Sequence, residues 1–162
     1  MLLRLLLLFA ARAKAAISRG PAGPYPVAHK VVSLVDHSRW DPYAPEGKPY
    51  RRRVLVSVFE PLDVAPEQCG TETIAYLPPR TADTYTVVAE ELLMLPGLLF
   101  QGHELEFCSL STSVSPRSQP SAGKAWPTVI YSPGFSASRL LASAQAQSLA
   151  AQGNVVITVD HP

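Results

Sequence analysis

The sequence has little of several features that would assign a function at once. Among 162 residues there are two cysteines, no C-x-x-C pair and no cysteine or histidine pair at metal-ligand spacing, so a zinc site is not expected. The apolar run near the N-terminus is far too short to span a bilayer. The formal net charge is +1, and the densest basic cluster, residues 51–53, runs directly into an apolar stretch. A nucleic-acid interface needs more positive charge on one surface, so nucleic acid is not an expected partner.

The sequence does contain enough apolar material for one folded domain. Hydrophobic residues make up 47% of the chain, which excludes general disorder, and the length suits a single core. Of the 16 prolines, most precede Pro127, which predicts loops and short strands in that half.

Residues 1–19 are expected to be a signal peptide. Arg4 is followed by a short apolar stretch and then by alanines that offer a cleavage site. The alternative is a mitochondrial presequence, because this segment holds several basic residues and no acid. The leucines are contiguous and do not form one face of a helix, which favours secretion.

In a secreted chain, Cys69 and Cys108 predict one disulfide. Closing a loop of about 40 residues would stabilise the fold by roughly 4 kcal/mol. The alternative is two unrelated buried thiols. The single asparagine, Asn154, is not in a sequon, so N-glycosylation is not expected.

The first 126 residues predict a loop-rich half with few regular elements. Strand character is expected at residues 27–35, 53–60 and 105–110, a weak helix at 81–95, and loops at 36–49, 67–80 and 111–126.

The last 36 residues carry the strongest pattern. An apolar strand at 128–132 precedes a helix at 140–152, for which Ser138 is a plausible N-cap and Gly153 a stop. Residues 155–159 are a β-branched run typical of a strand buried on both faces. This order predicts a β-α-β unit with two parallel strands, whose carboxyl ends are the expected place for a site.

The loop at that place reads "YSPGFSASR", residues 131–139, which approaches the nucleophile pattern G-x-S-x-G. Ser136 would be the nucleophile, but only Asp160 and His161 remain to complete a triad after it. Adjacent residues of an extended segment point to opposite sides, so Asp160 could not orient His161.

Two other interpretations of this loop stay open. In one, Gly134 allows a turn and the backbone N–H of Phe135 stabilises the oxyanion of an acyl-transfer reaction. In the other, the loop is only a turn in a different α/β fold.

Three stretches resemble the secreted fungal relatives of platelet-activating factor acetylhydrolase, a family of α/β-hydrolases. They are "SRWDPYAPEGKPYRRRVLVSVFEPL" at 38–62, "CGTETIAYLPPRTA" at 69–82, and "PTVIYSPGFSASRLLASAQAQSLAAQGNVVITVDHP" at 127–162. Cutinase-like polyester hydrolases are similar to the third stretch alone, and the first two favour the acetylhydrolases.

The resemblance implies that residues 20–162 form the N-terminal portion of an α/β-hydrolase, with a mixed or parallel sheet and flanking helices, incomplete. It makes Phe135 the donor of an oxyanion-hole N–H and Ser136 a turn residue. It also implies a calcium-independent serine esterase, without metal or cofactor, that removes the short sn-2 acyl group of a phospholipid. In the family, the nucleophile elbow, catalytic Asp and catalytic His follow the equivalent of Pro162, so this chain alone is expected to be inactive. The alternative is a secreted binding protein without enzymatic activity.

The expected partners follow from the same resemblance. They are a phospholipid or other short-chain ester, with peripheral contact to a membrane or lipoprotein surface. The strand at 128–132 would lie at an edge of the sheet without the strand that carries the family's nucleophile. Such an uncharged edge predicts aggregation or dimerisation.

Overall fold

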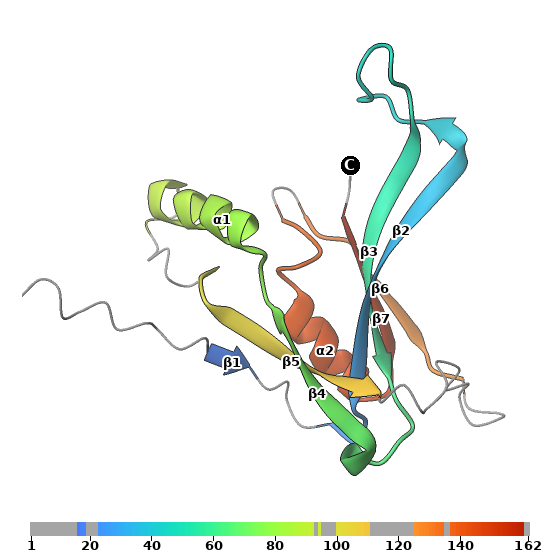
Figure 1. Cartoon of the computed structure of the whole chain (residues 1–162), viewed down its shortest axis with the longest axis vertical. Coiled ribbons are helices and arrows are strands. Elements are labelled where there is room, and N and C mark those ends of the chain that lie inside the picture. Colours follow the sequence, from blue (N-terminus) through green and yellow to red (C-terminus); the bar gives the residue numbers. More distant parts are fainter. Residues whose placement is uncertain are drawn as a thin grey trace, which may run out of the picture.

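In the part of the chain that the structure describes, two β-sheets lie on either side of a helix (Figure 1). The computed structural model describes residues 16–18, 23–92, 94, 100–110, 125–134 and 137–160. No helix within these residues is both long enough and apolar enough to cross a bilayer.

The larger sheet has four strands in the order β2-β3-β7-β6. They are β2 (Val27–Trp40), β3 (Arg51–Pro61), β7 (Val155–Asp160) and β6 (Thr128–Tyr131). β3 is antiparallel to both β2 and β7, whereas β6 and β7 are parallel. The parallel pair joined by a helix is therefore confirmed, as the expected portion of an α/β-hydrolase fold requires.

The smaller sheet has the order β1-β5-β4. β1 (Ala16–Ser18) is parallel to β5 (His103–Leu110), and β4 (Cys69–Ala75) is antiparallel to it. A 3-10 turn, Pro66–Gln68, leads into β4, and α1 (Pro79–Leu92) follows it. Cys69 and Cys108 form the expected disulfide, with Cα atoms 5.1 Å apart and a sequence separation of 39.

Helix α2 (Ser143–Ala151) connects the two sheets through the core. Its buried alanines, Ala146 and Ala150, pack against Phe59 and Val156 of the larger sheet. Small side chains let the helix approach the sheet closely. The core cluster consists of Val27, Phe59, Leu105, Phe107, Ala146, Ala150, Ala151 and Val156.

Two expected loops are partly strand. Residues 67–80 contain β4, and residues 36–40 continue β2 to Trp40 through a shift in register after Asp36. β4 has no buried residue, so it shows none of the apolar alternation by which a strand is recognised in sequence. The linker expected at 111–126 lies outside the described residues except for its last two.

The helix expected at 140–152 begins later than the sequence predicts. Its N-cap is Ala142, and the Oγ of Ser138 instead accepts a hydrogen bond from the N–H of Leu140 at 3.3 Å. Turns occupy residues 139–142, because Arg139 is hydrogen-bonded to Asp160 at the end of β7. Gly153, with φ of +92°, ends the helix as expected.

The expectation that β7 is buried on both faces is wrong for the described residues. Val156 and Thr158 are buried, whereas Ile157 between them is half-buried. Helix α2 covers the face that carries Val156, and β-branched residues occupy both faces of the strand.

Candidate active-site loop

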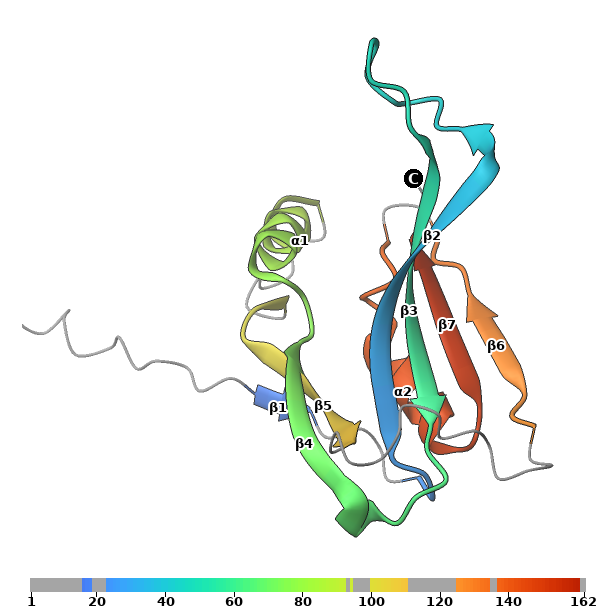
Figure 2. The ribbon, with the colours of Figure 1, turned by 45° about the vertical axis from the view of Figure 1, so that its right-hand side comes forward.

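The loop that follows β6 lies at the carboxyl ends of the two parallel strands (Figure 2). β6 ends at Tyr131, and the chain then runs through residues 132–142 before α2 begins. β7 ends at Asp160 beside it. Open α/β sheets generally bind ligands outside the carboxyl ends of their parallel strands.

Arg139 and Asp160 join the end of this loop to the end of β7. The backbone N–H of Arg139 donates to one carboxylate oxygen of Asp160 at 2.7 Å, and Nη1 of Arg139 donates to the other at 2.7 Å. The Arg139 side chain is 10% exposed and the Asp160 side chain 28%. Both charges are therefore largely removed from water, where the geometry of a charge-assisted pair matters most.

Two backbone hydrogen bonds close short segments of the loop. The N–H of Ala137 donates to the carbonyl of Gly134 at 3.2 Å, and the N–H of Leu141 donates to the carbonyl of Ser138 at 3.2 Å. Pro133 is buried and Gly134 is exposed. Phe135 and Ser136 lie outside the described residues.

Neither the backbone conformation at residue 134 nor the space around it requires a glycine. Its φ lies outside the left-handed region, and a Cβ placed on it would meet no described atom within 4 Å. A glycine that is free of both constraints leaves room for an approaching group at this point of the loop.

The smaller sheet and the residue after β4 hold the same end of the loop and the helix that follows. The hydroxyl of Tyr76 donates to the carbonyl of Leu141 at 2.5 Å, and burial raises the pKa of Tyr76. Nε2 of Gln147 on α2 donates to the carbonyl of Glu106 on β5. The turn before α2 and the helix itself are thus hydrogen-bonded to the side of the smaller sheet.

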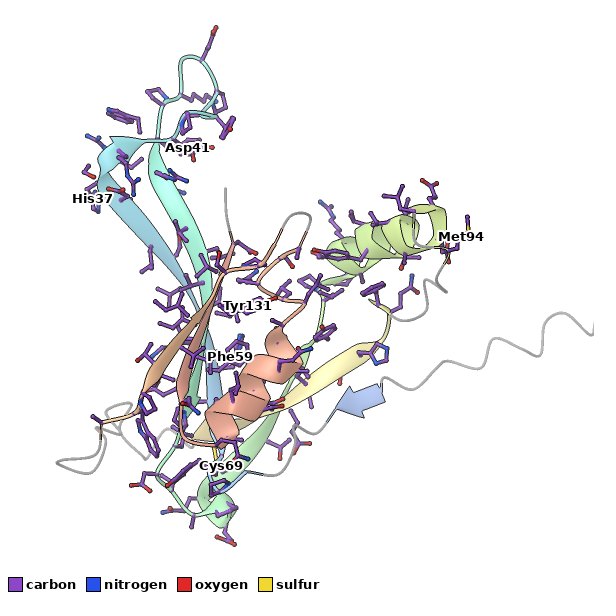
Figure 3. All side chains as sticks on the ribbon, turned by 180° about the vertical axis from the view of Figure 1, so that it is seen from behind. His37, Asp41, Phe59, Cys69, Met94 and Tyr131 are labelled. Atoms are coloured by element: carbon purple, nitrogen blue, oxygen red, sulfur yellow. A yellow bond between two sulfur atoms is a disulfide. The ribbon has the colours of Figure 1, made fainter. Side chains whose placement is uncertain are left out.

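His29 lies on β2 and is half-buried beside Phe59, a core residue that Figure 3 labels. Its ring stacks on Phe107 with centroids 4.9 Å apart and lies 5.0 Å from Phe59. Burial lowers the pKa of His29, and the positive charge of Arg139 lowers it further. His29 is therefore neutral at neutral pH and packs on the two phenylalanine rings.

The described residues give Asp160 a structural role. Both of its oxygens accept hydrogen bonds from Arg139, which fixes the carboxylate between the end of the loop and the end of β7. His161, the other residue considered for a triad with Ser136, lies outside the described residues.

Comparisons with known proteins identify the family. The sequence profile of the family described as "Platelet-activating factor acetylhydrolase, isoform II" matches residues 49–162. The chain belongs to this family. A protein of Arthroderma benhamiae named "Probable 1-alkyl-2-acetylglycerophosphocholine esterase" is 30% identical over 147 residues, which cover 88% of this chain and 36% of that protein.

A solved structure supports the same fold. The ferulic acid esterase from Streptomyces cinnamoneus matches with a TM-score of 0.55 and 23% identity, covering 91% of this chain and 36% of that one. At this identity the match shows the fold alone. The chain thus spans little more than a third of the length of either relative.

The sequence of this acetylhydrolase-family chain predicted the loop but not the clamp that holds it, which is the ion pair between Arg139 and Asp160. The signal was present: Arg139 and Asp160 are opposite charges that follow two predicted parallel strands. Because the carboxyl ends of parallel strands lie at one edge, the two charges could have been paired in advance.

Proposed function

We propose that this chain supplies the oxyanion loop of a serine esterase that removes short acyl groups from the sn-2 position of phospholipids. The single observation that carries the proposal is the clamp between Arg139 and Asp160, which fixes the loop after β6 beside the carboxyl end of β7. Membership of the acetylhydrolase family and the name of the Arthroderma relative support this substrate class.

The chemistry requires fixed N–H groups at this loop. When a nucleophile attacks an ester carbonyl, the carbonyl oxygen becomes negatively charged in the transition state. A backbone N–H already aimed at that oxygen stabilises it without reorganisation, and losing one such donor costs about 3 kcal/mol. Phe135 provides this N–H in our proposal, and the open side of Gly134 admits the acyl group.

The 162-residue chain does not hydrolyse esters by itself in this proposal. Asp160, which was considered for a triad with Ser136, is paired with Arg139. Ser136 therefore serves as a small turn residue and not as the nucleophile.

Secretion is part of the same proposal. The disulfide between Cys69 and Cys108 supports an oxidising compartment, since such bonds persist outside the cytosol.

A chimera tests the function. Residues 49–162 would replace the matching segment of the Arthroderma relative, and hydrolysis of a 2-acetyl glycerophosphocholine would be compared with that of the unaltered relative. We expect the chimera to hydrolyse the ester and the 162-residue chain to stay at background. An inactive, folded chimera beside an active relative would favour the binding protein without enzymatic activity.

A further inference from the structure

The hairpin of β2 and β3 extends well beyond the candidate active-site loop. Leu55 of β3 pairs with Asp160, the last residue of β7, and with Ser33 of β2. Residues 34–54 therefore lie past the end of β7, on the side to which the carboxyl ends of β6 and β7 point. Figures 1 and 3 show this hairpin standing clear of the rest of the described chain.

The hairpin tip, residues 36–53, exposes aromatic side chains. Trp40 is 56% exposed, Tyr43 80% and Tyr50 38%. The adjoining strands add the exposed apolar side chains of Leu34 and Val35. Aromatic residues with a polar edge, such as Trp and Tyr, are the ones enriched where protein meets the interface of a lipid bilayer.

Positive charge is interleaved with these rings. The guanidinium of Arg51 lies 3.8 Å from the ring centroid of Trp40, and that of Arg53 lies 5.7 Å from that of Tyr50. The tip has five basic side chains against three acidic ones, an excess of two, whereas the whole chain has a net charge of only +1. The basic residues are Arg39, Lys48, Arg51, Arg52 and Arg53, and the acidic ones are Asp36, Asp41 and Glu46.

Two of the acidic residues, Asp36 and Asp41, form hydrogen bonds within the tip. The carboxylate of Asp36 accepts hydrogen bonds from Ser38 and Arg39, which lowers the pKa of Asp36. Asp41 accepts the N–H of Tyr43 at 2.9 Å and donates its own N–H to the carbonyl of Tyr50 at 3.0 Å. The rings are thus presented by an ordered turn, which lowers the entropy lost on binding.

We propose that the hairpin tip docks on a phospholipid surface that contains anionic lipid. Trp40, Tyr43 and Tyr50 enter the interfacial region, and the arginines contact lipid phosphates. Because the tip lies past the carboxyl ends of β6 and β7, docking turns the candidate active-site loop toward that surface. This inference rests on the proposed function, because an esterase of membrane phospholipids needs its loop near the bilayer.

Fluorescence of Trp40 tests the docking directly. The chain has two tryptophans, so a Trp126→Phe background makes Trp40 the only reporter. The full chain in this background would be titrated with vesicles of phosphatidylcholine, alone and mixed with phosphatidylserine, and with vesicles carrying brominated acyl chains. Residues 1–19 include an apolar stretch that can bind lipid, and quenching by bromine distinguishes the hairpin from that stretch because it is local to Trp40.

We expect the Trp40 emission to shift to the blue and to be quenched by bromine, more strongly with phosphatidylserine. Arg52→Gln and Arg53→Gln should each weaken vesicle binding by about fivefold. Tyr43→Ser should weaken it by about threefold or more. Leu149→Ser removes an exposed apolar side chain on α2 and is the matched control, with unchanged binding.

Three results would overturn the docking proposal. They are unaltered Trp40 emission with both vesicle types, tighter binding to a single-stranded DNA oligomer than to vesicles, and equal losses in the Leu149→Ser control. Loss of binding in Leu92→Ser with the hairpin variants unaffected would place the lipid contact on α1 instead. Hydrolysis of water-soluble p-nitrophenyl acetate by the chimera needs no lipid surface, so failed docking beside retained hydrolysis would reject this inference alone.

Discussion

Arg139 donates both its backbone N–H and a guanidinium N–H to the carboxylate of Asp160, each at 2.7 Å. One residue precedes α2 and the other ends β7, so this pair closes the β-α-β unit at the edge where a site is expected. The loop between Pro133 and Ser138 is therefore held at its far end by a largely buried ion pair.

Breaking this pair should cost more stability than breaking an exposed one. Asp160→Ala leaves the buried Arg139 charge without a partner and should lower the free energy of unfolding by about 3 kcal/mol. Lys30→Ala breaks the exposed pair of Lys30 and Glu60 and should cost less than about 1 kcal/mol. Urea unfolding measures the free energy of unfolding of both variants. An equal decrease in the two would mean that the pair of Arg139 and Asp160 does not hold the loop.

The substitution Gly134→Ala tests whether this glycine serves activity or the stability of the fold. Gly134→Ala should leave stability unchanged or raise it by up to about 1 kcal/mol, because the backbone and the space accept a Cβ. The same change in the chimera should lower kcat by about tenfold or more, because a methyl group would obstruct the acyl oxygen.

Gly153→Ala is the matched control for that comparison. Its φ of +92° disfavours a side chain, and an added Cβ would lie 2.9 Å from the Trp126 ring, so stability should fall by about 1–3 kcal/mol. Thermal melting measures both variants. A strongly destabilised Gly134→Ala would show that the glycine serves the fold.

His29 should make stability depend on pH near neutrality. Its pKa in the folded chain is below the ordinary value of about 6.5, so the unfolded chain binds the proton more tightly. The stability that neutral His29 contributes is fully present above about pH 6.5 and is lost as the pH falls toward the lowered pKa.

The test is the free energy of unfolding between about pH 7 and pH 5. We expect it to fall with pH in the parent chain, less steeply in His29→Phe, and as in the parent in His37→Gln, whose side chain is exposed. Asp36 titrates in a lower range, because its pKa is also lowered from a value near 4. Parallel curves for the parent and His29→Phe would refute the assignment.

The edge strand β6 should drive self-association. It is the outer strand of the described sheet, pairs only with β7 there, and exposes Ile130 at 69%. Unblocked edges of this kind pair with other chains, and a lysine on the edge prevents it. Ile130→Lys should convert dimers or larger species to monomer in sedimentation velocity. A parent chain that is already monomeric at tens of micromolar (roughly the range in which exposed edges associate) would contradict this prediction.

The sequence predicted the strands that carry an apolar pattern and missed β4, which carries none. β3 and β7 carry β-branched runs against the core, and both were expected within two residues of their observed bounds. β4 has no buried residue, so only its pairing with β5 reveals it. The start of α2 was misplaced because Arg139 is drawn to Asp160, a contact between residues 21 positions apart that local propensity does not show.

The loop itself was found from its place between a strand and a helix, and its interpretation relied on the family resemblance. Spacing alone left Ser136 open as a nucleophile. The spacing of Asp160 and His161 argued against a triad with Ser136. The pairing of Asp160 with Arg139, a tertiary contact, is a second argument against it.

The most direct test of the oxyanion loop is to remove the N–H of Phe135 while keeping its neighbours. In the active chimera, Phe135→Pro deletes the donor, and Phe135→Ala deletes only the ring. We predict that Phe135→Pro lowers kcat by about a hundredfold, whereas Phe135→Ala keeps most of the activity. Equal activities of the two variants, or complete loss of activity in Ser136→Ala, would contradict the assignment of this loop.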